Sequence, residues 1–111
     1  MSYQVQLSNF EGPLDLLLYF IRRDELDIYD IPIARITRDF IDLIEQWKKL
    51  NMVVAGDFIV MASTLMRVKA KMMIPRPELD EEGDIIDPRT ELIMQLIEYK
   101  RYRNAAEIMD A

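Results

Sequence analysis

The chain has 111 residues and a mass of 13.1 kDa, which is enough for one ordinary domain. Half of the residues are apolar, and 20 acidic against 14 basic side chains give a net charge of −6. The absence of His and Cys excludes an imidazole base, a Ser-His-Asp triad, a thiol nucleophile, a disulfide and a zinc site built from Cys and His.

Other common routes to catalysis are also missing from the sequence. Neither the G-x-x-x-x-G-K-[ST] phosphate loop nor the G-x-G-x-x-G fingerprint occurs. Ser2, Ser8 and Ser63 have no neighbouring base to activate them. A calcium loop with Gly83 at its sixth position would need a Glu where Arg89 stands. We therefore expect no enzymatic activity, no metal and no cofactor.

No segment is suited to a membrane or to export. The longest uncharged apolar run is Leu16–Ile21, whereas about 20 apolar residues are needed to span a bilayer. Met1–Gly12 shows no basic stretch followed by an apolar one. We expect a soluble, cytoplasmic protein without membrane contact, and the lack of Cys fits a reducing compartment.

The first residues alternate between apolar and polar types. Tyr3, Val5 and Leu7 are separated by Gln4 and Gln6, which is the two-residue period of a half-buried strand. No hairpin partner is evident nearby. We therefore expect one short extended strand, which is isolated or pairs with another chain.

Two helices are predicted next. Pro13 begins the first, because Pro fits the first helical position, and the charged stretch Arg22–Asp27 ends it. This helix is apolar nearly all round, which indicates burial on more than one side. Asp30 and Pro32 begin the second helix, with Asp30 as the expected cap, and apolar residues at helical spacing continue to about Leu50.

The third predicted helix runs from about Val54 or Asp57 to Ile74, because Pro75 and Pro77 stop it. Its apolar side chains spread over roughly 240°, whereas packing on one core needs about 100°. These side chains are Phe58, Ile59, Met61, Ala62, Leu65, Met66, Val68, Ala70, Met72, Met73 and Ile74. The helix is therefore either the centre of a small bundle or has a second face for a partner. The methionines suit an adaptable partner surface, but they also fill cores.

The last third of the chain begins with an acidic stretch. Residues 78–86 carry five acids and Gly83, so we expect a mobile linker. Asp87 and Pro88 start a fourth helix of their own, with a short, imperfect heptad seam. We predict an all-α fold: a three-helix bundle over residues 1–77, the linker 78–86, and a partner-binding segment 87–111 outside that core.

Basic residues are concentrated in one part of the chain. Residues 58–77 carry Arg67, Lys69, Lys71 and Arg76 and no acid. The acidic total argues against binding of phosphate backbones by this chain. The basic stretch is most simply a solvated helix face, and nucleic-acid binding by these residues stays open as a weaker interpretation.

Several blocks of residues follow one another along almost the whole chain in a familiar order. They are Phe10–Leu18, Asp30–Ala34 with Ile36 and Thr37, Ala55–Ala62, Leu65–Pro75, Asp87–Arg89, Glu91 with Leu92, and Leu96–Lys100. Together they resemble the segregation and condensation protein A family, the bacterial kleisins. Ser63 and Ala70 depart from the family pattern, which should alter packing more than role.

The resemblance implies a non-catalytic adaptor in chromosome condensation and segregation. Kleisins bridge the two ATPase heads of a structural-maintenance-of-chromosomes (SMC) dimer. Their N-terminal helical domain packs against the coiled-coil neck of one head, and their middle segment carries segregation and condensation protein B. The resemblance covers the N-terminal domain and the start of the middle segment, and it implies a nucleoid-associated location.

We place the two expected binding sites on the third and fourth helices. For the SMC neck we expect Phe58, Met61, Leu65, Val68, Lys69 and Met72. For protein B we expect Leu92, Leu96, Tyr99, Tyr102 and Met109. Two alternatives stay open. One is a helical module that homodimerises through the same surface without an SMC partner; the other is a helix-turn-helix DNA binder, which has the helix count but not the charge.

Overall fold

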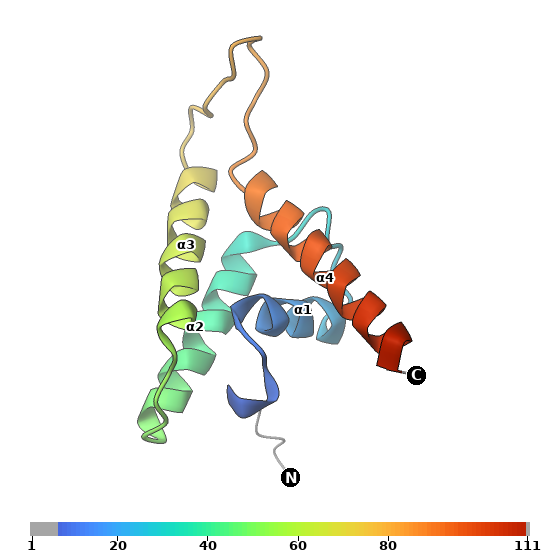
Figure 1. Ribbon diagram of the computed structural model, residues 1–111. Coiled ribbons are helices and arrows are strands. Elements are labelled where there is room, and N and C mark those ends of the chain that lie inside the picture. Colours follow the sequence, from blue (N-terminus) through green and yellow to red (C-terminus); the bar gives the residue numbers. More distant parts are fainter. Residues whose placement is uncertain (1–6, 111) are drawn as a thin grey trace.

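The computed structural model describes residues 7–110, without the side chains of residues 109 and 110. In that range a short 3-10 turn precedes four helices, and the predicted all-α class is confirmed (Figure 1). The elements are η1 Leu7–Asn9, α1 Pro13–Arg23, α2 Ile33–Lys49, α3 Gly56–Met72 and α4 Thr90–Asp110. The predicted N-terminal strand falls mostly outside the described residues, and its last residue, Leu7, belongs to the turn.

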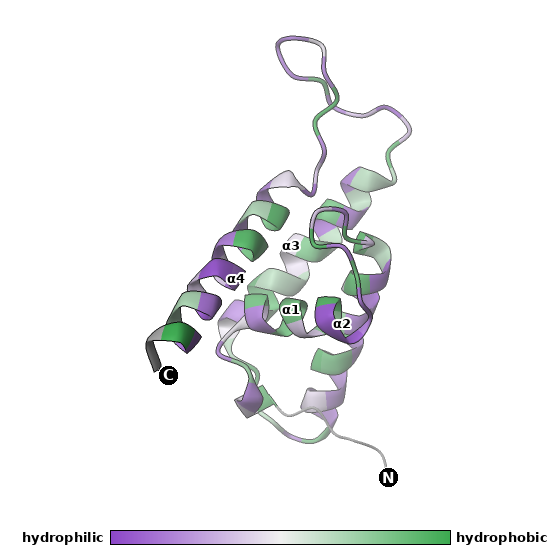
Figure 2. Ribbon diagram, turned by 90° about the vertical axis from the view of Figure 1, so that its right-hand side faces the viewer, coloured by the Kyte–Doolittle hydropathy of each residue, from purple (hydrophilic) through white to green (hydrophobic). Residues whose placement is uncertain are grey.

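Helix α1 lies at the centre of the bundle. Pro13 occupies its first turn as predicted, and Asp15 adds a negative charge where the helix dipole favours one. Its buried apolar side chains are Leu16, Leu17, Leu18, Phe20 and Ile21. The helix contacts α2, α3 and α4, which explains why its sequence is apolar nearly all round (Figure 2).

Helix α2 forms one wall of the core. Its buried apolar side chains recur every three or four residues: Ile33, Ile36, Phe40, Ile44 and Trp47. Trp47 meets Phe58 of α3 edge to face at 5.9 Å between ring centroids, and Phe40 stacks on the same ring at 6.3 Å. The expected cap is corrected: Pro32 is the N-cap residue, and the Asp30 side chain makes no capping hydrogen bond.

Helix α3 packs against α2 and α1. Phe58, Leu65 and Val68 are buried on its inner side. The Thr37 hydroxyl of α2 donates to the Leu65 carbonyl oxygen at 3.5 Å, so this buried hydroxyl has a partner. The helix ends at Met72, two residues earlier than predicted.

The acidic segment between α3 and α4, which we expected to be a mobile linker, forms an organised turn. Leu79 and Ile85 form an isolated antiparallel bridge, and the Asp80 carboxylate accepts two backbone N–H groups inside the turn. Gly83 has a φ of +85°, a conformation that L side chains rarely adopt. The turn projects away from the helices (Figure 1).

Helix α4 returns across the bundle and lies along α1. Leu92 and Leu96, one turn apart, are 3% and 0% exposed and belong to the same core as the first three helices. The structure therefore corrects the expectation that residues 87–111 stand outside the core. The physical reason is that Leu92, Leu96 and Tyr99 occupy one face of α4, which matches the uncovered apolar side of α1.

Candidate protein-interaction surfaces

The start of α4 is held by one arginine. Arg89 pairs with both carboxylate oxygens of Asp87, at 3.1 and 2.8 Å. Its Nη1 also donates to the Asp30 carboxylate and to the Ile31 carbonyl oxygen, each at 2.8 Å. The hydrogen bond from Arg89 lowers the pKa of Asp87, and those to Asp87 and Asp30 raise the pKa of Arg89. Asp30, the predicted cap of α2, thus fastens α4 to the loop before α2.

A second polar cluster holds the middle of α4 against the start of α1. Arg103 Nη1 lies 3.1 Å from an oxygen of Asp15, whose side chain is only 6% exposed. The Tyr99 hydroxyl donates to Glu11 at 2.9 Å, and Arg103 lies 3.6 Å from the same carboxylate. Burial raises the pKa of the Tyr99 hydroxyl. The first and last blocks of the sequence resemblance, Phe10–Leu18 and Leu96–Lys100, therefore meet here through Glu11 and Tyr99.

Most of the residues predicted for the SMC neck lie on the inner side of α3 or only partly reach the surface. Phe58, Leu65 and Val68 are 3%, 0% and 8% exposed and face the core, so they present no surface to a partner. Met61 and Lys69 are half-buried, and only Met72 is exposed. The apolar arc is wide enough for two faces, but the pattern alone does not say which half meets α1 and α2.

The opposite side of α3 carries an exposed row, which we call the outer face of α3. It consists of Ile59, Ser63, Met66, Ala70 and Met73, all exposed. Ile59, Met66 and Met73 are spaced seven residues apart, with small side chains between them, so they form one seam. That seven-residue spacing was the sequence signal for an open face, and our site prediction missed it.

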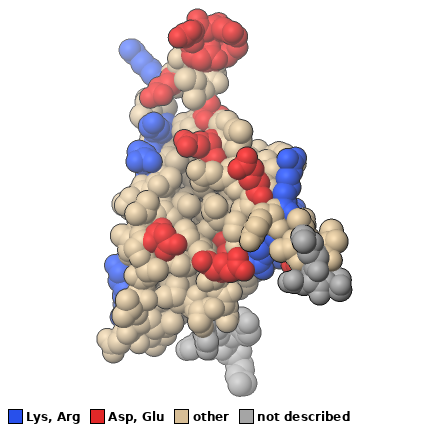
Figure 3. Space-filling view, in the orientation of Figure 1, with Lys and Arg blue, Asp and Glu red and all other residues tan. Residues whose placement is uncertain are grey.

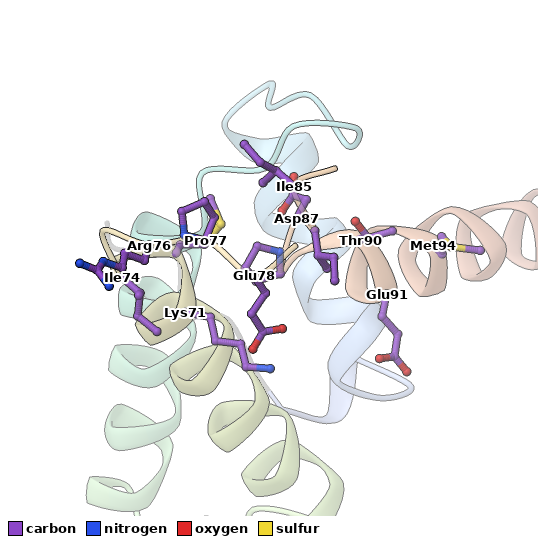
Figure 4. Close-up of a pocket in the computed structure, with 13 residues that line it drawn as sticks. Lys71, Ile74, Arg76, Pro77, Glu78, Ile85, Asp87, Thr90, Glu91 and Met94 are labelled. Atoms are coloured by element: carbon purple, nitrogen blue, oxygen red, sulfur yellow. The ribbon is translucent and has the colours of Figure 1, made fainter. Parts of the chain in front are cut away.

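Helices α3 and α4 splay apart and leave two adjacent hollows between them. The upper one, about 630 Å³, has an apolar lining that includes Met72, Ile74, Ile85 and Met94 (Figure 4). The lower one, about 400 Å³, is bordered by α3 and α4. Its lining includes Met61, Val68, Arg67, Leu92 and Gln95. Three of the predicted neck residues, Met61, Val68 and Met72, thus border these hollows and not the outer face.

The residues predicted for protein B are divided between core and surface. Leu92 and Leu96 are buried against α1, and Tyr99 is half-buried and tied to Glu11. Tyr102 is 66% exposed. The side chain of Met109 lies outside the described part of the chain.

The described residues contain neither a group of side chains suited to a metal ion nor a helix suited to a membrane. Among the described residues, no group of three or more acidic side chains is placed to hold a metal ion. No helix in residues 7–110 has the length and apolar character needed to cross a membrane.

The fold and its surfaces define a small four-helix domain with one exposed apolar helix face. The family described as "Segregation and condensation protein ScpA" matches residues 20–111. The chain belongs to the segregation and condensation protein A family, so the resemblance read from the sequence is confirmed.

Relatives named segregation and condensation protein A occur in several bacteria. The protein from Brevibacillus brevis is 48% identical over 96% of this chain, and the one from Lactiplantibacillus plantarum is 47% identical over 92%. The protein from Xylella fastidiosa is 48% identical over 99%. The chain covers 45%, 41% and 36% of these three relatives, less than half of each.

Proposed function

We propose that this chain is a non-catalytic part of a bacterial chromosome-condensing complex and acts in chromosome segregation and condensation. The family, whose members are named for these processes, supports the role. In this role the domain joins protein partners in the cytoplasm, at the nucleoid, and needs no cofactor or nucleotide. Calorimetry with ATP tests the last point, and stoichiometric binding would contradict it.

We infer that the partner of α3 is the coiled-coil neck of an SMC ATPase head. The observation that carries this proposal is the outer face of α3, where Ile59, Met66 and Met73 form an exposed seam with a seven-residue period. A coiled coil presents apolar side chains with the same period, so one more helix packs along it by the same interdigitation. The outer face thus replaces the buried Phe58 and Leu65 as the proposed contact.

A second partner, protein B, fits the far end of α4. Tyr102 is exposed there, and Met109 follows it seven residues later. The side of α4 that faces α1 is already engaged up to Arg103, so a second partner would bind the exposed side, at Tyr102 and the residues after it. Substitution of Tyr102 by Ala should weaken capture of protein B and leave capture of the neck unchanged.

Binding to a purified SMC head that retains its neck tests the α3 proposal. Met66→Glu should weaken the complex by about tenfold or more, because it places a charge in the centre of the apolar seam. Met94→Glu is the matched control, since Met66 and Met94 are 57% and 59% exposed on different helices. A folded Met66→Glu variant that binds as well as the unchanged protein would contradict the placement.

The same exposed face also suits self-association, because an apolar row in contact with water favours any apolar partner. Light scattering over a concentration series separates the two functions. A monomer that binds the neck supports the adaptor role. A dimer that Met66→Glu dissociates, with no affinity for the neck, would support the self-associating module instead.

A further inference from the structure

We propose that the outer face of α3 is built for a helix whose apolar stripe is bordered by carboxylates. The inference rests on the proposed function and adds the chemistry of the partner. It comes from the placement of charge around the seam of Ile59, Met66 and Met73, a feature that the apolar residues alone do not explain.

The charges beside the seam are all of one sign. Arg67 follows Met66 and Lys71 follows Ala70, so at about 100° per residue both lie on the same flank, the one that borders the lower hollow between α3 and α4. Lys69 precedes Ala70 and lies on the other flank. Both flanks are therefore basic over the second half of the helix, and the basic atoms are visible along the upper part of α3 in Figure 3.

These basic side chains are not used inside the domain. Within residues 7–110, none of Arg67, Lys69, Lys71 and Arg76 forms an ion pair, whereas Arg23, Arg35, Arg38, Arg89 and Arg103 all do. The segment that follows α3 carries five acids. Glu78 borders the upper hollow together with Lys71 and Arg76, the other four lie in the projecting turn, and none of the five is ion-paired with these cations in the described part of the chain (Figures 3 and 4). The positive charge beside the seam is thus available to a partner.

An apolar seam with basic residues on both flanks favours a helix as the partner and not a phosphate backbone. A surface for phosphates places basic groups at its centre, because the phosphate charges supply most of the affinity. Here the centre is apolar and the basic groups stand at the edges, which is the arrangement of a coiled-coil interface with charged flanking positions. Carboxylates on both sides of the partner's apolar stripe would complement these flanks and fix its register.

A charge reversal separates this inference from the proposed function. We would measure the dissociation constant for the SMC head with its neck, from low to high salt. The first variant is Arg67→Glu with Lys71→Glu, and the control is Lys100→Glu with Arg101→Glu. The control pair is exposed on α4, without an ion pair among the described residues, and carries the same change in net charge.

The α3 double variant should weaken binding by about tenfold at low salt, and the difference should shrink as salt screens the charges. The α4 control should change the affinity by less than about twofold. Replacing neck carboxylates beside the apolar stripe by Lys should restore binding of the α3 variant, because it restores opposite charges. Circular dichroism confirms that each variant is folded.

Each contrary outcome has its own meaning. If the unchanged domain binds the neck and the α3 double variant binds equally well, the charge inference is wrong and the proposed function stands. If the unchanged domain does not bind the neck, the proposed function fails and the inference falls with it. If the α3 double variant instead abolishes binding to a DNA duplex or dissociates a dimer, the occupant is DNA or a second copy, and the inference is overturned.

Discussion

Substitution of Leu96 by Ala tests whether α4 belongs to the folded core. The Leu96 side chain is 0% exposed and lies between α4 and the rest of the core. Replacing a buried Leu by Ala costs about 2–5 kcal/mol, because transfer free energy is lost and a cavity remains. Since α4 lies at the outside of the bundle and can partly close the cavity, we expect about 3 kcal/mol. That is a large share of the roughly 5–15 kcal/mol that stabilises a domain.

Urea unfolding followed by circular dichroism measures this loss, which corresponds to a fall in the melting temperature of roughly 12 °C. The matched control is Met94→Ala, two residues earlier and 59% exposed, which should change the free energy of unfolding by less than about 0.5 kcal/mol. Hydrogen exchange shows which part of the protein is destabilised, and the amides of α4 should exchange faster in Leu96→Ala than in the unchanged protein.

The reasoning would be refuted if Leu96→Ala and Met94→Ala had the same small effect. Such a result would mean that α4 is detached in solution and that residues 87–111 form a separate segment, as the sequence alone suggested. Slow exchange over the first half of α4 in a demonstrated monomer would instead support the docked helix.

Three further predictions concern the polar contacts and the turn. Arg103→Ala removes the guanidinium beside Asp15 and should lower the free energy of unfolding in urea by about 1 kcal/mol, because the Arg103 side chain is 30% exposed and its charge is partly screened. An unchanged free energy of unfolding would show that this contact is absent in solution. The hydrogen bond from Arg89 lowers the pKa of Asp87 in the folded protein below its ordinary value of 3.8. The Asp87 carboxylate therefore stabilises the fold at pH values above 3.8, and this stabilisation is lost as the pH falls through the lowered pKa. From about pH 5 to about pH 3 the unchanged protein should therefore lose more stability than Asp87→Asn in thermal melts, and parallel curves would contradict this. Gly83→Ala should speed hydrogen exchange within residues 78–86, because φ is +85° there, whereas Gly83→Asn should have a smaller effect; equal protection in both would argue against the turn.

The polar contacts of α4 give a structural account of several residues in the resemblance. At the start of α1, the Glu11 carboxylate accepts a hydrogen bond from Tyr99, and the Asp15 carboxylate accepts one from Arg103. Arg89 donates to Asp30 in the loop before α2. These side chains hold α4 to the bundle, so their first role is architectural. The exposed apolar side chains that remain lie on the outer face of α3, along the groove between α3 and α4, and at Tyr102.

Much of the local structure follows from local rules and was predictable. Pro13 marks the start of α1 because its missing N–H has no partner there in any case. The apolar spacing in α2 was sufficient to predict its buried face, including Phe40 and Trp47. One local prediction was wrong for a physical reason: the Asp30 carboxylate accepts a hydrogen bond from the Arg89 guanidinium and caps no helix N–H. The acidic segment that we expected to be a mobile linker forms a turn around Asp80 and Gly83.

The sequence by itself determined the helices and their order, because capping, proline placement and apolar period act over a few residues. The family followed from the ordered blocks of residues that resemble it, such as Phe10–Leu18 and Asp30–Ala34. Which half of the apolar arc of α3 is buried was decided only by the tertiary structure, since Phe58, Leu65 and Val68 belong to the buried core while Met66 is 57% exposed. The docking of α4 likewise depends on pairs 59 and 88 residues apart, Arg89 with Asp30 and Arg103 with Asp15. No local pattern contains such pairs, because they exist only once the chain has folded.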